Sequence, residues 1–377
     1  MGMYLRIILN KKLPVKERIK NLIAYFRVRR GANIAWKDMF RQFFEAAPEN
    51  KRPATAPEEK AHAAYWNYFS RKVNPFTYRV CKNLSGTGDV RYIPEEIYIA
   101  DIEATLNRDA TADFMANKSF YNHRFPSGIF PVDYFHNVDG EYLDAELNTI
   151  TFEEVEKIAA RLSYPVSMKP NRDSYGGKDV CFPADADELV RMARGSRNFV
   201  VQEKISQHPF FNRFNDYGLN TIRVSLYRSV TDNRIHVINA CMRMGVGGSL
   251  DNTSSGGIVC YIRPDGHLNG YAVNKLGFRY LKHPDTQMPF TDQLPDLEQL
   301  WTMSRSVAHK AFYARIISLD ACYDVYGKWR LVEVNVVGQH TIKFAQNGGQ
   351  PYFGDFTDEV VNYCKTNHWA LTYNPGR

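Results

Sequence analysis

The sequence lacks several features that would assign a protein to a class at once. No cysteine stands in a C-x-x-C pair, and the six cysteines are scattered over 377 residues. Several lie in apolar runs, which favours reduced, buried thiols. No apolar run approaches the roughly 18 residues that cross a bilayer, and the N-terminus lacks the apolar segment and small-residue cleavage site of a secretion signal. We therefore expect a cytoplasmic protein, either soluble or peripheral at the inner face of a membrane.

Low complexity and internal repeats are also absent, and the composition is that of a folded chain. Hydrophobic residues make up 44% of it, which is too high for a disordered protein. The chain is longer than a domain with a single hydrophobic core usually is, so two or three packed subdomains are expected. The net charge of +7 is a modest basic excess, which favours acidic ligands such as phosphates or uronic sugars without requiring nucleic acid.

The first 97 residues have the character of a helical region. From Pro14 to Arg30, apolar residues recur at helical spacing between lysines and arginines, which predicts a basic amphipathic helix. Such a helix can lie on an anionic membrane, giving a peripheral membrane contact. The more common alternative, which we expect here, is a helix packed on its own domain with a solvated basic face. A short strand is expected to follow at residues 98–101.

From Lys118 onward the chain changes to short β-rich runs joined by glycine-containing turns, with one helical pattern at Leu297–Ile316. This predicts an α+β enzyme core. The expected strands are residues 164–169, 199–203, 221–228, 235–244, 257–262, 316–320 and 330–334.

The strongest candidate site lies on the strand near residue 333. Glu333 and Asn335 are two positions apart, so they project from one face while valines cover the other. Asp320 ends the preceding apolar run, and the turn at 326–328 would return the chain as a hairpin. Three oxygen ligands on paired strands suit Mg²⁺ and its phosphate ligands. The alternative is a surface acid pair on a hairpin, which an isolated E-x-N cannot exclude.

Two lysines upstream are candidates for phosphate binding. Lys169 closes an apolar run and leads into a flexible turn that contains Ser174, Gly176 and Gly177. Such a turn can fold backbone N–H groups over phosphates. Lys118 precedes a segment whose structure the pattern does not assign. Taken singly, each lysine could equally be a solvated charge.

Two further groups complete the set. The run 199–205 is an apolar strand that turns abruptly polar, and its edge could serve an adenine and its ribose or simply be a strand leaving the core. Arg223 and Arg243 each sit inside apolar strands, where a buried guanidinium needs an anion. That anion could be a transferred phosphate, or it could be a carboxylate that forms a structural ion pair with the arginine.

The order of these elements resembles the ATP-grasp superfamily, and most of all the sugar-transfer-associated ATP-grasp proteins. The resemblance covers roughly residues 98–363 and leaves the N-terminal helical region outside. The motifs that carry it are Val201-Gln202-Glu203, Gln207-His208-Pro209, Leu219 to Val224, Arg243-Met244-Gly245, Asp251-Asn252 and Ser255 to Ile258.

The resemblance implies a fold of two α+β subdomains that clamp ATP. It implies a linker subdomain at 98–163, a small subdomain with the glycine loop and adenine hinge at 164–210, and a C-terminal catalytic subdomain at 211–377. It also assigns roles by position. Lys118 and Lys169 would bind phosphates, residues 174–177 would form the mobile loop, and Arg223 and Arg243 would lie near the transferred phosphate and the acyl group. The metal ligands, holding two Mg²⁺ ions, would be Asp320, Glu333 and Asn335, and the nucleotide hinge would be Gln202, Glu203 and Ile205.

This sequence departs from the family pattern in two places. Gln202 precedes Glu203 where many relatives have two acids, so His208 or Gln207 would hold the ribose. The loop after Asn335 lacks the proline that is common there.

The implied activity is ATP-dependent carboxylate-amine ligation through an acylphosphate. The acid would be a uronic sugar of a surface polysaccharide, free, lipid-linked or polymeric, and the amine an amino acid or similar compound; the converse, an acid joined to an amino sugar, fits equally. Alternatives are a sugar kinase on the same fold, a non-catalytic nucleotide-binding component of a polysaccharide assembly system, and a structural protein with a coincidental E-x-N.

Overall fold

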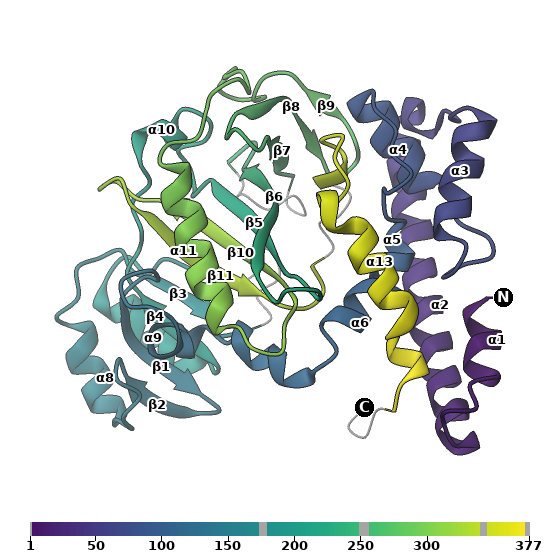
Figure 1. Ribbon diagram of the computed structural model, residues 1–377. Helices are drawn as coiled ribbons and strands as arrows, with labels where there is room; N and C mark the ends of the chain where they lie inside the picture. The colour runs from purple at the N-terminus through teal and green to yellow at the C-terminus, as the bar shows by residue number, and fades with distance from the viewer. Residues whose placement is uncertain (1, 173–178, 249–255, 340–344, 374–377) are drawn as a thin grey trace.

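The computed structural model describes residues 2–172, 179–248, 256–339 and 345–373, which form a helical region and two β-sheets (Figure 1). The helical region contains the long helix α2 (Val15–Ala46) beside α1 (Met3–Ile8), α3 (Ala56–Trp66) and α4 (Phe76–Ser85). A buried segment follows, made of α5 (Glu95–Ile97), a π-helix (Tyr98–Glu103) and α6 (Ala104–Leu106).

The first sheet is small and antiparallel, with the order β2-β1-β4-β3. Its core consists of apolar side chains from the strands and from two helices, and a capping box in which Thr151 and Glu154 bond each other's backbone starts the first of these helices. The elements are β1 (Asp133–Val138), β2 (Glu141–Asp144), α8 (Phe152–Ala159), β3 (Ser167–Pro170), α9 (Ala186–Gly195) and β4 (Phe199–Gln202).

The second sheet has seven antiparallel strands in the order β11-β10-β5-β6-β7-β8-β9. One face packs against α11 (Leu297–Lys310), which crosses it in Figure 1. Between the sheets the chain forms the short helix α10 (Pro209–Asn212). The strands are β5 (Thr221–Arg228), β6 (Ile235–Met244), β7 (Ile258–Ile262), β8 (Leu268–Asn274), β9 (Arg279–Tyr280), β10 (Ile316–Tyr323) and β11 (Trp329–Asn335).

Strand alternation gives the two faces of this sheet different chemistry. Ile222, Val224 and Leu226 of β5 belong to the core under α11, so the intervening Arg223 and Ser225 project from the opposite face. The same alternation holds along β10, where Ile317, Leu319 and Ala321 are in that core. The face away from α11 is therefore polar at its centre.

The N-terminal region is part of the same packed structure. Trp36, Phe40 and Phe43 of α2 share a core with Tyr271 and Val273 of β8. At the other end of α2, Met3, Ile7 and Tyr25 pack with the C-terminal Trp369 and Ala370, which follow α13 (Thr357–Thr366). Figure 1 shows α13 lying between the large sheet and α2.

One expectation about this region is wrong. The segment expected as a strand at 98–101 is a π-helix, because a short apolar run does not distinguish a strand from a buried helix. The helix at 14–30 packs on its own domain with a solvated basic face, as expected, and the side that it buries is polar. Its buried residues there are Asn21, Tyr25 and Arg29, whereas Val15, Ile19, Ile23 and Phe26 are exposed.

The small sheet runs across the boundary expected at residue 163, because β1 pairs with β4. The expected division at residue 97 likewise falls within the buried segment formed by α5 and the π-helix. All six cysteines are free, and five of them are buried. No helix in the described ranges combines the length and the apolar character needed to cross a membrane.

Candidate functional site

A row of charged side chains crosses the centre of the polar face. Glu333 of β11 stands opposite Asp320 of β10, and Asp320 stands opposite Arg223 of β5. Directly paired residues of antiparallel strands share one face, so the three side chains adjoin. The hairpin expected from the sequence is confirmed, and its register places Asp320 opposite Glu333.

Asp320 is held by two arginines. Its Oδ1 accepts a hydrogen bond from Nε of Arg223 at 2.7 Å, and its Oδ2 accepts one from Nη2 of Arg223 at 2.6 Å and one from Nη1 of Arg243 at 3.0 Å. Burial alone would raise the pKa of this carboxyl, but the two guanidinium groups outweigh burial and hold the pKa far below its usual range. Asp320 is therefore ionised, and both arginines are fixed beside it.

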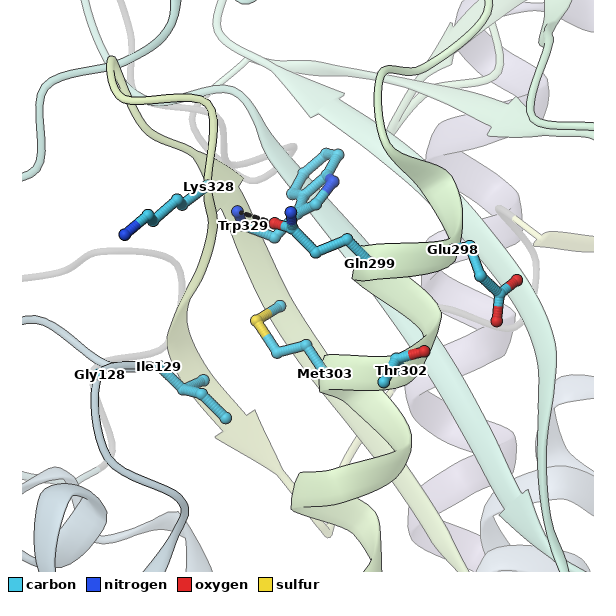
Figure 2. A pocket seen from close by; sticks show the side chains of 8 residues that line it. All are labelled: Gly128, Ile129, Glu298, Gln299, Thr302, Met303, Lys328 and Trp329. Carbon is cyan, nitrogen blue, oxygen red and sulfur yellow. Dashed lines mark hydrogen bonds between the residues drawn. The ribbon is translucent and has the colours of Figure 1, made fainter.

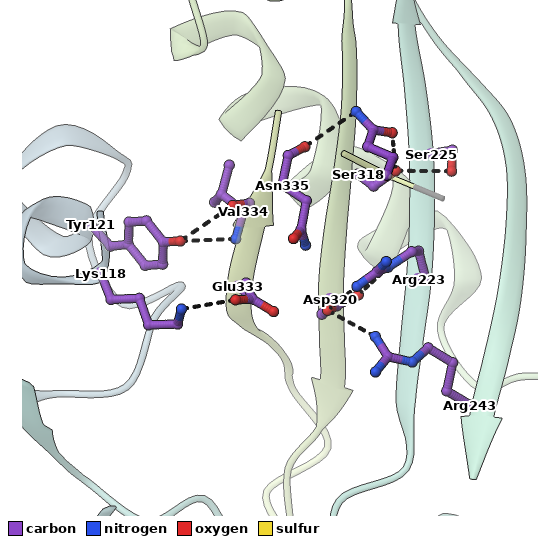
Figure 3. Close-up of polar contacts among 11 residues, drawn as sticks. Lys118, Tyr121, Arg223, Ser225, Arg243, Ser318, Asp320, Glu333, Val334 and Asn335 are labelled. Carbon is purple, nitrogen blue, oxygen red and sulfur yellow. Dashed lines mark hydrogen bonds and ion pairs between the residues drawn. The ribbon is translucent and has the colours of Figure 1, made fainter. Parts of the chain in front are cut away.

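Glu333 is paired with a lysine from outside the sheet. Nζ of Lys118 lies 2.8 Å from its Oε1, and Figure 3 shows this pair beside the Asp320 cluster. Lys118 begins a short 3-10 helix (Lys118–Phe120), and its backbone N–H donates to the carbonyl of Asn171, just after β3. Tyr121, three residues on, accepts a hydrogen bond from the backbone N–H of Val334 at its hydroxyl. This segment thus connects the end of the small sheet to β11.

Lys169 lies on β3 of the small sheet, and its charge is the least compensated in the site. Burial, with a further contribution from the charge of Lys118, lowers its pKa to about 8. Glu333 acts on Lys169 in the opposite direction, so the three side chains are close enough to interact electrostatically. Among the described residues, none forms a hydrogen bond or ion pair with its ammonium group. A half-buried lysine without a partner is costly unless an anion joins it.

Among the described residues, the site has an excess of positive charge. Four cations, Lys118, Lys169, Arg223 and Arg243, face the two carboxylates of Asp320 and Glu333. This imbalance favours a polyanionic ligand such as a nucleotide triphosphate.

The residues also fit a magnesium ion. In the described part of the chain no three His, Cys, Asp or Glu side chains gather in a metal-binding group, so a third side-chain ligand beside Asp320 and Glu333 has to be an amide. Asn335, opposite Ser318, is on the same strand as Glu333, and its buried Nδ2 has no hydrogen-bond partner. Amide oxygen and nitrogen are interchangeable by a flip, and an oxygen at this place would suit a hard cation.

The expected hinge residues lie at the end of β4, where their side chains hold the two sheets and the loop after β4 together. Gln202 donates to Asp133 of β1 at 2.6 Å. Glu203 accepts from the backbone of Val132 at 3.1 Å and from Arg330 of β11 at 3.0 Å. Within the described residues, neither side chain forms a hydrogen bond with the Asp320–Glu333 row.

Ile205 and His208 follow in the same loop. Ile205 is buried, and His208 caps α10 by accepting from the backbone N–H of Phe210 while its ring contacts Tyr323. Gln207 bonds to Asn212, Asn215 and Asn220, which fixes the loop around α10. The nucleotide-contact role of this segment stays a prediction. Ser174, Gly176 and Gly177 lie outside the described residues.

Sequence reasoning missed two supporting groups. Arg330 bonds Glu203 and also lies 3.4 Å from Asp324, so it ties the end of β4 to the β10–β11 hairpin. Gln339, after β11, accepts a hydrogen bond from Ser318 at 2.7 Å and donates its backbone N–H to Glu103. Nothing in the local sequence indicates these contacts, because the bonded residues are 127 and 236 positions apart.

A surface pocket of about 500 Å³ lies elsewhere. Figure 2 shows it beside α11, with Met303, Trp329 and Ile129 among its lining residues. Trp329 belongs to the core under α11, on the face opposite the charged row. This pocket is separate from the candidate site.

A comparison with protein families matches residues 188–350 to the model described as sugar-transfer associated ATP-grasp. The matched range begins in α9 and contains every strand of the large sheet, with Arg223, Arg243, Asp320, Glu333 and Asn335. The matched range is 163 of the 377 residues. Over this range the chain is similar to the sugar-transfer-associated ATP-grasp proteins, in agreement with the resemblance seen in the sequence.

Solved structures that match this chain over part of its length include three ligases. An L-amino acid ligase from Bacillus licheniformis is 13% identical, over 64% of this chain and 43% of its own, with a TM-score of 0.32. D-alanine–D-alanine ligase from Bacillus anthracis complexed with ATP is 14% identical, over 70% and 68%, with a TM-score of 0.37. The ATP-grasp ligase PsnB, complexed with a precursor variant, Mg and ADP, is 13% identical, over 68% and 61%, with a TM-score of 0.39.

This chain thus spans less than half the length of the Bacillus licheniformis ligase. A comparison with curated proteins gives no match.

Proposed function

We propose that this protein is an ATP-dependent carboxylate-amine ligase that works through an acylphosphate. The observation that carries the proposal is the row Glu333–Asp320–Arg223, with Lys118 and Arg243 bonded to its carboxylates. It combines oxygen ligands for a divalent cation with an excess of positive charge for phosphates. The family match over residues 188–350 supports the same reading.

Lys118 and Lys169 bind the phosphates of ATP in this proposal. The ammonium group of Lys118 has three N–H donors, so it can keep its hydrogen bond to Glu333 and still donate to a phosphate oxygen. Lys169, which has no described partner, gains one when ATP binds. The two lysines come from different parts of the small-sheet side of the site, so both are needed to hold the phosphate chain in one orientation.

Asp320, Glu333 and Asn335 would hold Mg²⁺, which when bound neutralises charge on the phosphate oxygens; the resemblance gives two ions. These side chains meet the requirement for oxygen ligands on rigid strands. Because Asp320 is kept ionised by its arginines, it is ready to act as a ligand throughout the neutral pH range.

Arg223 and Arg243 stabilise the reacting groups. A guanidinium has five N–H donors, and Asp320 accepts only two from Arg223, which leaves donors for the oxygens of the transferring phosphoryl group. A carboxylate oxygen of the acid attacks the γ-phosphorus and ADP leaves. The amine nitrogen then attacks the acyl carbon, phosphate leaves, and the nitrogen loses a proton to give the amide. No covalent bond to the protein forms.

The substrates we propose are a uronic acid of a surface polysaccharide precursor and an amino acid or other amine, or an acid and an amino sugar. Support comes from the description of the family as sugar-transfer associated and from the basic character of the site. A sugar kinase would use the same phosphate-binding residues, but it would make a phosphoester without an amine. A non-catalytic nucleotide-binding component of an assembly system would bind ATP without consuming it.

The test is a coupled assay of ADP and phosphate release with Mg²⁺, ATP and paired panels of uronic sugars and amines. Ligation predicts release that needs both an acid and an amine, with an amide product in mass spectrometry. Glu333→Gln should abolish it. Glu359→Gln is the matched control, because Glu359 is also partly buried but bonds Tyr227 and Ser229 away from the row. ADP release with a sugar alone and a phosphorylated sugar would identify a kinase instead.

A further inference from the structure

The first half of α2 exposes its apolar side to solvent. Val15, Ile19, Ile23 and Phe26 are 60%, 54%, 47% and 48% exposed, respectively. In contrast, Asn21 and Arg29 are 3% and 6% exposed. A surface helix normally buries its apolar stripe against the core, so this arrangement is the reverse of the usual one.

The buried polar side is well bonded, which fixes the helix in this orientation. Asn21 donates to the carbonyls of Ala370 and Thr372. Arg29 forms an ion pair with Asp101 at 2.7 Å, and both side chains are buried. Tyr25, between them, donates to the same carboxylate. The helix cannot turn its apolar side inward without breaking these contacts.

The exposed apolar residues form one continuous stripe. Their spacings of four, four and three residues keep them within one sector of a helix that turns about 100° per residue. A row of exposed basic residues lies beside the stripe at corresponding spacing: Lys16, Lys20, Arg27 and Arg30. Between residues 15 and 37 the only acid is Glu17.

Helix α1 adds to this surface. Leu5, Ile8 and Leu9 are 45%, 45% and 57% exposed, and the exposed Lys11 and Lys12 follow. Nη1 of Arg18 donates to the carbonyl of Ile8 at 2.7 Å, which fixes the end of α1 to α2. In Figure 1 both helices lie at the edge of the molecule that faces away from the sheets. We call the exposed apolar and basic residues of 5–30 named here the α1–α2 face.

We propose that the α1–α2 face binds the surface of a membrane that contains anionic lipid, with α2 lying in the plane of the interface. Apolar side chains of this kind insert between lipid headgroups, and the adjacent lysines and arginines contact their phosphates. Contact with a second copy of the chain is disfavoured, because a two-fold interface would bring the two basic rows together. The proposal does not depend on the reaction that the protein catalyses.

Vesicle cosedimentation of the full-length protein tests it. Two vesicle types are compared: pure phosphatidylcholine, and phosphatidylcholine with about one third phosphatidylglycerol. We expect binding to the anionic vesicles at least about tenfold stronger than to the neutral ones. The triple substitution Ile19→Ser, Ile23→Ser and Phe26→Ser should lower binding at least about tenfold, and Lys16→Gln with Lys20→Gln should lower it about fivefold per charge.

Matched controls use residues of similar exposure elsewhere. Phe278→Ser, Leu281→Ser and Phe312→Ser replace apolar side chains that are 40%, 65% and 55% exposed. Lys157→Gln with Arg191→Gln removes two exposed charges from α8 and α9. Both controls should bind vesicles like the unaltered protein. Light scattering after gel filtration gives the oligomeric state of each variant in parallel.

Equal binding of the Ser triple and its control would overturn the proposal. So would an absence of binding to anionic vesicles. A dimer that the Ser triple converts to a monomer, without vesicle binding by the unaltered protein, would assign the face to contact between two copies instead.

Discussion

Asp320 and Glu333 stand opposite each other on β10 and β11, and each carboxylate is paired with cations from a different side of the site. Arg223 and Arg243, from the large sheet, hold Asp320. Lys118, from a segment bonded to the end of the small sheet, holds Glu333. Asp320 and Glu333 therefore lie where the two sheets meet, and the two carboxylates can contact one ligand there.

Removing the Asp320 carboxylate should destabilise the protein as well as inactivate it. Asp320→Ala leaves two buried guanidinium groups without their anion, which costs about 3–5 kcal/mol of unfolding free energy. The lowered pKa of Asp320 gives the pH dependence: its contribution is complete above the ordinary carboxyl pKa and is lost as pH falls. Urea unfolding at neutral pH measures the effect. A loss below about 1 kcal/mol would show that the cluster is not a buried ion-pair network.

The affinity for ATP should fall as Lys169 loses its proton. Its pKa of about 8 means that the free protein holds this charge at pH 7 and has mostly lost it at pH 9. Phosphate binding needs the charged form, so the dissociation constant for MgATP should rise about tenfold over this interval. Lys169→Met should bind weakly at both pH values. Calorimetric titration measures both proteins, and an identical pH profile in the variant would exclude Lys169 as the cause.

Glu103 should make the protein less stable as pH rises. Burial raises its pKa to about 7, although Gln339 donates a backbone hydrogen bond to it. Between pH 4.5 and 7 the folded state therefore binds a proton that the unfolded state has released, so unfolding free energy falls with rising pH and stays low above 7. Glu103→Gln should remove this loss, which is on the order of 2–3 kcal/mol.

The measurement is urea unfolding of both proteins at pH 5 and pH 8. Subtracting one pH dependence from the other removes the contribution of Glu96, a second buried carboxyl with a raised pKa. A difference of zero would mean that the folded protein does not raise the pKa of Glu103.

The N-terminal helices should be required for folding of the whole chain. Phe43 packs against β8, and its ring fills the space beside Gly277, where an added Cβ would lie 2.0 Å from it. Phe43→Ala should cost about 3–5 kcal/mol through the cavity it leaves. Phe26→Ala, at an exposed position of the same helix, should change stability by less than about 0.5 kcal/mol. Comparable effects of the two substitutions would contradict the packing described here.

The sequence was most informative where one face of a strand is buried. Alternation of apolar residues predicted β5 and β6 with their observed ends, and it placed Glu333 and Asn335 on one side of β11. The short connection predicted that the strand of Asp320 pairs with β11, but the register, which includes a bulge after Asp320, came only from the structure. The sequence therefore indicated that Asp320 and Glu333 lie on paired strands, but not that Arg223 adjoins them.

Other features depend on contacts between distant residues and left no local pattern. The Lys118–Glu333 pair joins positions 215 residues apart. The orientation of α2 was missed because hydrophobic periodicity predicts an apolar interface, whereas Arg29 and Asn21 are buried by partners at Asp101 and Ala370. The residues around 98–101 were misassigned because four apolar and acidic residues fit either a strand or a buried helical turn.

The most direct test of the proposed ligation follows the oxygen atoms. The protein is incubated with MgATP, amines and a pool of acids labelled with ¹⁸O in their carboxylates, and the released phosphate is analysed by mass spectrometry. Formation of an acylphosphate transfers a carboxylate oxygen to phosphorus, so the account predicts one ¹⁸O in each phosphate released in ligation, and none with Glu333→Gln because no phosphate forms. ADP accompanied by unlabelled phosphate throughout would show transfer to water and would contradict the proposed ligase.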